Sequence, residues 1–289
     1  MTTAVQFPSH TYQTHTESKH FGTRASRIMI PNISDPENQF EKQGVTFKII
    51  TDDMCPKVHR SLGLKSTCLI SVLFEVIEFM WKHFFPDEPL MRSLGMTEPH
   101  WLIDDTYIRD SIKKGACVAA VNEKEEILAI RLGVVKNRND HSTRIFEKVF
   151  SWLFSFPFTC SFLPTSMKRT WVSEMLFKKI NYNAWAMFEK LGCDRIYDDK
   201  AVCSARDHGI KGLGTEICLR SERLAADLGC TYTFAAVTGI YSQKVFEKLE
   251  HTTLTSLDYE DFKDENGELY LKDTREHKKI ITCYKKLIN

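Results

Sequence analysis

The sequence has no apolar run long enough to cross a membrane. Its longest apolar stretch, residues 149–162, is interrupted by Ser151, Ser155, Pro157 and Thr159. A helix needs about 20 consecutive apolar residues to span a bilayer. We therefore expect no membrane span, while contact of this stretch with a membrane surface stays open.

The sequence also lacks a surplus of charge of either sign. Its 39 basic and 38 acidic residues leave a net charge of +1, with 43% hydrophobic and 27% charged residues. Nucleic-acid-binding domains carry a basic surplus, so we expect no nucleic-acid partner. The composition is that of an ordinary globular protein, and 289 residues are enough for a sizeable core.

Metal-binding patterns are missing as well. The nine cysteines include no C-x-x-C pair and none at ligand spacing from a histidine. We expect no metal, and reduced thiols in a cytoplasmic protein. Cys203 and Cys218 flank a glycine-rich run, and we interpret them as small buried residues rather than as catalytic thiols.

The first 43 residues have little hydrophobic periodicity and are rich in polar side chains. We expect residues 1–43 to form a disordered arm, followed by one domain over residues 44–289. Lys19, Arg24 and Arg27, with few acidic residues nearby, give the arm some character of a mitochondrial transit peptide. A variable extension of a cytoplasmic protein is the favoured alternative.

One glycine-rich run stands between a predicted strand, residues 196–205, and a predicted helix, residues 215–229. It consists of Gly209, Ile210, Lys211, Gly212, Leu213, Gly214 and Thr215. Glycines let a ligand approach the backbone closely, and the first turn of a helix offers unpaired N–H groups. The run is therefore a candidate cradle for a phosphate group, or a glycine-rich helix start that binds nothing.

The order of these glycines matches neither common nucleotide motif. A dinucleotide fingerprint reads G-x-G-x-x-G, whereas this run reads G-x-x-G-x-G. A P-loop has Lys and then Ser or Thr after its last glycine, but here Thr215 and Glu216 follow. We therefore expect neither a dinucleotide-binding protein nor an NTPase.

Strand and helix patterns alternate along the rest of the chain, which indicates an α/β or α+β fold with a mixed sheet. The predicted strands are residues 45–50, a hairpin of 116–121 and 127–135, 232–237, and two terminal strands flanking 263–267, the last ending at 280–284. The predicted helices are residues 69–84, 172–191 and 243–249. Aromatic side chains in residues 145–162 either pack in the core or line an acceptor pocket.

Two further segments strengthen the interpretation of the glycine run. Residues 84–90 read Phe-Phe-Pro-Asp-Glu-Pro-Leu, and residues 241–249 read Tyr-Ser-Gln-Lys-Val-Phe-Glu-Lys-Leu. Both resemble sequence boxes of the arthropod arylalkylamine N-acetyltransferases, a branch of the GNAT acyltransferase superfamily. The glycine run resembles motif A of that superfamily through Gly212 and Gly214. The resemblance covers residues 44 to the C-terminus.

The run departs from motif A at one position. Gly209 stands where that motif has Arg or Gln, so the missing cation would have to come from Lys211 or Arg206.

The resemblance implies a GNAT fold: a central twisted mixed β-sheet, flanked by helices and splayed at the cofactor strand. It implies a monomeric, metal-independent enzyme that transfers acetyl from acetyl-CoA to a small primary amine in a ternary complex. The implied acceptors are arylalkylamines such as dopamine, serotonin, octopamine or tryptamine. Agmatine or another polyamine is the alternative acceptor, and a catalytically weak acyl-CoA-binding protein is the alternative of another class.

The resemblance also assigns roles to residues of this chain. Glu88 would be the general base, acting directly or through water, and the neighbouring Asp87 would attract the cationic amine. Pro89 disfavours helical geometry at Glu88, so we expect an extended turn there. Without the resemblance, Asp87 and Glu88 would be a solvated acidic pair.

The main chain of Val202, Cys203 and Ser204 would bind the pantetheine arm and stabilise the oxyanion. Ser242, with Tyr241 beside it, matches a serine that would protonate the leaving thiolate, and Thr238 aligns with a second family serine. Ser242 could instead be the N-cap of the helix that follows. For His277, a structural role competes with a catalytic one.

Overall fold

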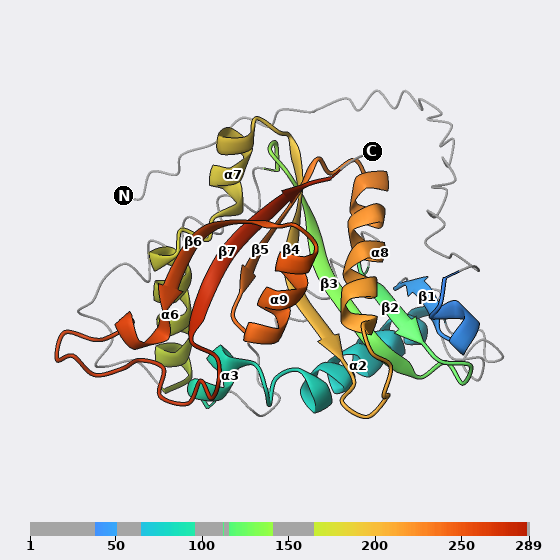
Figure 1. The fold of residues 1–289 in the computed structure, drawn as a ribbon, viewed down its shortest axis with the longest axis horizontal. Helices are drawn as coiled ribbons and strands as arrows, with labels where there is room; N and C mark the ends of the chain where they lie inside the picture. Colours follow the sequence, from blue (N-terminus) through green and yellow to red (C-terminus); the bar gives the residue numbers. More distant parts are fainter. Residues whose placement is uncertain (1–37, 51–64, 96–111, 113–115, 141–164, 288–289) are drawn as a thin grey trace, which may run out of the picture. The chain divides into compact units, whose positions relative to one another are not determined.

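The computed structural model describes residues 38–50, 65–95, 112, 116–140 and 165–287. Its centre is a seven-stranded mixed sheet in the order β1-β2-β3-β4-β5-β7-β6 (Figure 1). All neighbouring strands are antiparallel except β4 and β5, which are parallel. The strands are β1 Thr46–Ile49, β2 Val118–Val121, β3 Ile127–Asn137, β4 Arg195–Ser204, β5 Tyr232–Val237, β6 Thr252–Asp258 and β7 Lys279–Lys286. The predicted mixed sheet and the hairpin of β2 and β3 are confirmed.

The two parallel strands separate part-way along their length. Pairing between β4 and β5 ends at Asp199 and Ala235, whereas β4 continues to Ser204 (Figure 1). Beside this point the pairing of β3 with β4 also shifts, because Gly133 pairs with Asp199 but Leu132 pairs with Ala201. The splayed sheet that the resemblance implies is therefore present, at the strand it implies.

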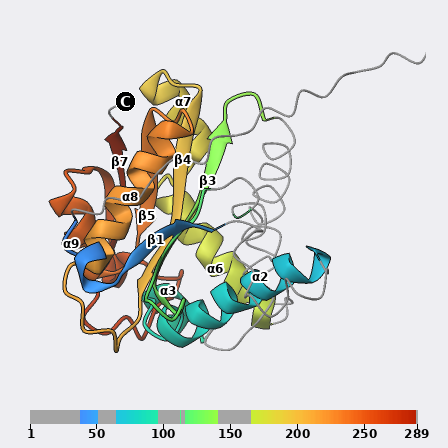
Figure 2. The ribbon, with the colours of Figure 1, turned by 90° about the vertical axis from the view of Figure 1, so that its right-hand side faces the viewer.

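Helices cover both faces of the sheet, with α8 and α9 on one side and α2 and α6 on the other (Figure 2). In β2, Ala119 packs in the core with α2, while its neighbour Ala120 packs in the core with α8. Successive strand residues point to opposite faces, which explains why every residue of β2 is buried. The helices are α2 Lys65–His83, α3 Pro89–Ser93, α6 Thr165–Lys179, α7 Ala184–Leu191, α8 Leu213–Asp227 and α9 Ile240–Lys248.

The single helix predicted for residues 172–191 is wrong, because the chain breaks it into α6 and α7. Asn181 adopts a left-handed conformation with φ 54°. The side-chain oxygen of Asn183 then accepts hydrogen bonds from the first N–H groups of α7, those of Trp185 at 2.9 Å and Ala186 at 3.2 Å. The left-handed residue ends α6, and the asparagine N-cap starts α7 in a new direction. The spacing of apolar residues in the sequence nevertheless continues across this break.

The last two strands are antiparallel neighbours as predicted, but the connection between them is longer than expected. It runs from residue 259 to 278, and residues 263–267 form only a small turn within it, closed by a bridge between Lys263 and Leu269. This long loop carries residues that reach the candidate site.

Residues 38–43, which precede the predicted domain, pack against α8. Phe40 is 3% exposed, in the core with Ile217 of α8. The Asn38 amide donates to Glu216 at 3.0 Å, and the Arg220 guanidinium pairs with Glu41. The packed part of the chain therefore begins no later than Asn38; the earlier residues of the arm, like the aromatic residues 145–162, lie outside the described residues. Within the described parts, no helix combines the length and apolarity needed to span a bilayer.

Candidate active site

Glu88 lies at the N-terminus of α3, in the extended conformation that Pro89 predicts, with φ −67° and ψ 119°. Its carboxylate accepts a hydrogen bond from the main-chain N–H of Met91 at 2.5 Å and so caps this short helix. Glu88 is 8% exposed. Burial raises the pKa of its carboxyl, opposed by hydrogen bonds from Thr238 and the main chain. A solvated acidic residue, the alternative that the sequence alone left open, does not describe Glu88.

Thr238 directly follows β5 and its side chain hydrogen-bonds to Glu88, so Glu88 sits beside the end of that strand. The Tyr259 hydroxyl donates to the Thr238 carbonyl at 2.7 Å. Tyr259 is 3% exposed, and burial raises its pKa. The nearby charge of Glu88 raises this pKa further, to a smaller extent. Nothing in the sequence around Tyr259 marked it as a neighbour of Glu88, because it comes from the long loop before β7.

Asp87 points to other partners than its neighbour Glu88. One carboxylate oxygen is 2.6 Å from the Arg206 guanidinium, and the other is 3.2 Å from that of Arg275. Arg206 follows β4, and Arg275 belongs to the loop before β7. Asp87 thus ties three separate segments together, and its charge is already compensated by two cations.

The end of β4 presents main-chain groups where β5 has departed. The Ala205 N–H donates to the Leu128 carbonyl at 2.8 Å, so these two residues form a hydrogen-bonded pair across the β3–β4 ladder. Hydrogen-bonded and non-bonded pairs alternate in an antiparallel ladder. The N–H and C=O groups of Cys203 therefore face β3, whereas those of Val202 and Ser204 face away from it. Val202 and Ser204 therefore have main-chain groups free of the β3 ladder, the orientation that binding of the pantetheine arm or an oxyanion would require, whereas Cys203 does not.

The glycine run forms the turn into α8 and adopts backbone conformations that favour glycine. Gly209 has φ +69° and Gly212, the N-cap of α8, has φ +83°. The first N–H groups of α8 have no acceptor within the helix. This first turn lies against β4, because a Cβ added to Gly214 would be 3.4 Å from the Ser204 hydroxyl. Strand, glycine turn and helix start are thus adjacent in space, as a site for a phosphate group requires.

The structure gives a physical reason for glycine at the position of the motif A cation. A Cβ atom added at Gly209 would meet no atom within 4 Å, but the left-handed φ would strain any other residue. Arg206 is engaged by Asp87, whereas Lys211 is exposed and lies between the two left-handed glycines. Lys211 is therefore the better placed of the two candidate cations.

Ser242 and Tyr241 lie in the first turn of α9. The N-cap interpretation of Ser242 is wrong: Gly239 is the N-cap, and the Ser242 hydroxyl donates to its carbonyl at 2.9 Å. The helix starts earlier than predicted because the His277 Nδ1, from the distant loop, accepts the Ile240 N–H at 3.0 Å. Tyr241 is 65% exposed. Its pKa is raised, chiefly by its hydrogen bond to Glu276.

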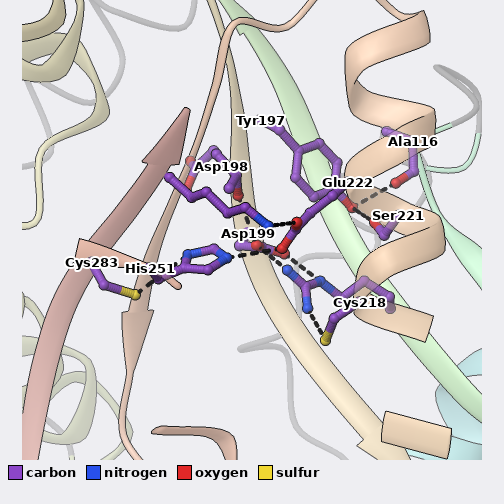
Figure 3. A network of polar contacts seen from close by, with 12 residues as sticks. Ala116, Tyr197, Asp198, Asp199, Cys218, Ser221, Glu222, His251 and Cys283 are labelled. Atoms are coloured by element: carbon purple, nitrogen blue, oxygen red, sulfur yellow. Dashed lines mark hydrogen bonds and ion pairs between the residues drawn. The ribbon is translucent and has the colours of Figure 1, made fainter. Parts of the chain in front are cut away.

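A buried ionic network stands where β4 and β5 separate (Figure 3). The Arg131 guanidinium of β3 forms two hydrogen bonds to the Asp199 carboxylate, one of them 2.6 Å long, and Thr233 of β5 donates to the same carboxylate at 3.0 Å. On the other face of β4, Asp198 pairs with Lys200 at 2.8 Å. This network connects the three strands beside the splay. The sequence analysis missed this network, although charged residues within otherwise apolar strands could have indicated it.

The cysteines near the glycine run behave as predicted. Burial raises the pKa of both the Cys203 and the Cys218 thiol to about 12, so neither forms a thiolate readily. Among the described residues, no three His, Cys, Asp or Glu side chains cluster in a way that could hold a metal ion.

The comparisons with known proteins agree with this architecture. No protein-family model matches the sequence, and no curated protein matches it. Among solved structures, arylalkylamine N-acetyltransferase 2 from Aedes aegypti is similar with a TM-score of 0.66 and 22% identity, over 84% of this chain and 99% of that one. The Drosophila melanogaster polyamine N-acetyltransferase, which forms N-acetylagmatine, is similar with a TM-score of 0.61 and 16% identity, over 84% and 100%. A mosquito arylalkylamine N-acetyltransferase like 5b follows with a TM-score of 0.60 and 16% identity, over 84% and 100%.

The chain has the GNAT fold. The fold implied by the three sequence boxes is therefore confirmed. Within it, the structure brings Glu88 and Thr238 together, and it places the glycine run of α8 against the end of β4. Tyr241 and Ser242 follow Thr238 within one helical turn of sequence, but the Tyr241 hydroxyl is engaged with Glu276 and the Ser242 hydroxyl with Gly239.

Proposed function

We propose that this chain is an acetyl-CoA-dependent N-acetyltransferase of small primary amines, with arylalkylamines as acceptors. The observation that carries the proposal is Glu88: a buried carboxylate with a raised pKa, at the start of α3, beside the end of β5 and the splay of the GNAT sheet. No basic side chain pairs with it within the described parts of the chain.

A base is needed because a primary alkylamine is protonated at neutral pH. Its ammonium group resembles that of lysine, with a pKa of about 10.4, and only the neutral amine attacks the acetyl carbonyl. A general base contributes most when its pKa lies near the operating pH. Burial moves the pKa of Glu88 in that direction. Glu88 accepts the proton directly or through one water molecule.

The main chain of β4 supplies the next requirement. The carbonyl oxygen of the acetyl group gains negative charge as the amine attacks, and fixed N–H groups stabilise such an oxyanion. The outward-facing N–H groups of Val202 and Ser204 are the donors for this purpose, and the same strand edge would hold the pantetheine arm. The cradle of Gly209 to Thr215, with Lys211 as its cation, would hold the pyrophosphate of acetyl-CoA.

The departing thiolate takes a proton, and hydroxyl groups are the candidate donors. Tyr241 carries its proton at neutral pH because the ordinary pKa of a tyrosine is about 10, and its hydrogen bond to Glu276 raises that pKa further. Ser242 and Thr238 are the other candidates. Transfer is direct, within a ternary complex, and none of these roles requires an acetylated residue.

Experiment can distinguish two alternatives to an arylalkylamine N-acetyltransferase. A structural neighbour forms N-acetylagmatine, which makes agmatine or a polyamine the alternative acceptor. The glycine at position 209 favours the other alternative, a weakly active acyl-CoA-binding protein, because a motif A cation is missing there.

Calorimetric titration with acetyl-CoA, followed by thiol-release assays over a panel of amines, tests the proposal. We expect binding and release of CoA thiol with tryptamine or dopamine. Binding without turnover of any amine would leave the binding-protein alternative, turnover of agmatine alone would leave the polyamine alternative, and absence of acetyl-CoA binding would contradict all three.

A further inference from the structure

Asp87 is held by two arginines at the rim of the candidate site. The side chains of Asp87, Arg206 and Arg275 are 45%, 52% and 45% exposed. Asp87 lies close enough to Cys203 of β4 and to Tyr241 of α9 to influence the pKa of each, although burial at Cys203 and Glu276 at Tyr241 act more strongly. The three charged groups therefore lie between the end of β4 and the start of α9.

Basic groups act on two of the three carboxylates around this rim, Asp87 and Glu276, but not on Glu88. Asp87 is paired with two guanidinium groups. Glu276 accepts from the Tyr241 hydroxyl and is influenced by the charges of His277 and Arg275. Within the described residues, Glu88 is the one of these three carboxylates that no basic group pairs with or influences. The site thus offers one uncompensated negative charge.

We propose that Arg206 and Arg275 determine specificity: by neutralising Asp87 they make the site prefer acceptors with a single cationic group over diamines. The inference rests on the proposed amine site and specifies its substrate class. It assigns Asp87 a different role from direct binding of the amine. The first ammonium group is received at Glu88, and a second one on the same acceptor meets two guanidinium groups instead of a free carboxylate.

The exposure of these three side chains limits how strongly they can discriminate between a monoamine and a diamine. Like charges repel, but solvent screens groups that are about half exposed. We therefore expect discrimination of about tenfold between a monoamine and a diamine, not an absolute barrier, in line with the modest energies of exposed ion pairs.

Pentylamine and cadaverine test the proposal, because they share one carbon chain and differ by one terminal ammonium group. The dissociation constant of each is measured by calorimetry with the protein saturated with CoA, and tryptamine acetylation is assayed separately. In the wild type we expect pentylamine to bind about tenfold more tightly. Arg275→Gln should reduce this preference at least threefold. Lys272→Gln is the matched control: it removes a positive charge from the same loop, from a side chain paired with Glu268 and not with Asp87.

Asp87→Asn separates the two roles of this residue. If the arginines set the specificity, removing their counter-charge increases the preference for pentylamine while pentylamine binding persists. A loss of pentylamine binding in this variant would instead show that Asp87 binds the amine directly and would overturn the proposal. Equal binding of the two amines by the wild type, an unchanged preference in Arg275→Gln, or no binding of either amine would also overturn it. Failure of the proposed function is a separate result, namely that tryptamine is not acetylated although the amines bind.

Discussion

The Thr238 hydroxyl donates a hydrogen bond to the Glu88 carboxylate, and this bond holds the pKa of Glu88 below the value that burial alone would produce. The two residues come from distant parts of the chain, the start of α3 and the end of β5. A hydrogen bond to the charged form of an acid favours that form. Thr238 therefore tunes the residue that we propose as the base.

Replacing Thr238 by valine should shift the pH dependence of kcat/KM. Loss of the hydroxyl removes an interaction that lowers the pKa of Glu88, so the folded protein should need a higher pH to ionise Glu88. The rising limb of the pH profile should move to higher pH. Thr238→Ser keeps a hydroxyl and serves as the control. A profile that moves equally in both variants would show that packing, and not the hydrogen bond, is responsible.

Glu88→Gln should lower kcat/KM by about 10² to 10⁴, the usual contribution of a positioned base. Activity that depends on ionised Glu88 rises with pH through its raised pKa, and this limb should disappear in the variant. The glutamine oxygen can still accept the Met91 N–H, so the cap of α3 is kept.

Glu88→Ala removes base and cap together. It should depress turnover, move the remaining activity to higher pH, where more of the amine is neutral, and destabilise the fold by about 1 kcal/mol through loss of the cap. Measured pH profiles and urea unfolding curves separate these effects. Wild-type profiles in both variants would remove Glu88 as the base.

Lys211→Ala should weaken acetyl-CoA binding about tenfold, because a charge-assisted hydrogen bond to phosphate is lost. Calorimetry measures the dissociation constant, and Lys124→Ala, in the exposed turn between β2 and β3, is the control. Gly209→Arg, which restores the motif A cation, should not improve binding, because φ +69° disfavours any residue with a side chain. Tighter binding in Gly209→Arg would contradict our explanation of this glycine.

The sequence predicted correctly those elements whose structure depends on residues close together in the chain. The β4 strand, the glycine turn and α8 are contiguous, so apolar spacing and glycine placement were sufficient. The break between α6 and α7 was missed, because the apolar period continues past Asn181 and the cap by Asn183 interrupts it without changing the spacing. The early start of α9 was missed because the residue that accepts the Ile240 N–H, His277, comes from a distant loop.

The contacts that shape the site are also between distant residues. The pairing of Asp87 with Arg206 and Arg275 depends on how three loops meet, and no local pattern encodes it.

Asp199→Ala should destabilise the fold by about 3 to 5 kcal/mol, the usual cost of leaving one member of a buried ion pair uncompensated. Arg131 is 1% exposed and its guanidinium would lose both hydrogen bonds to the carboxylate. Urea unfolding measures the change.

Two further variants test whether the ion pair itself is responsible. Asp194→Ala breaks the exposed pair with Arg138 and should cost about 1 kcal/mol or less. The double variant Arg131→Met/Asp199→Ala should be more stable than Asp199→Ala alone, because it leaves no buried guanidinium without its carboxylate partner. If the double variant were the less stable of the two, the loss would arise from packing around Arg131 and Phe246, and the ion pair would not be what holds β3, β4 and β5 together at the splay.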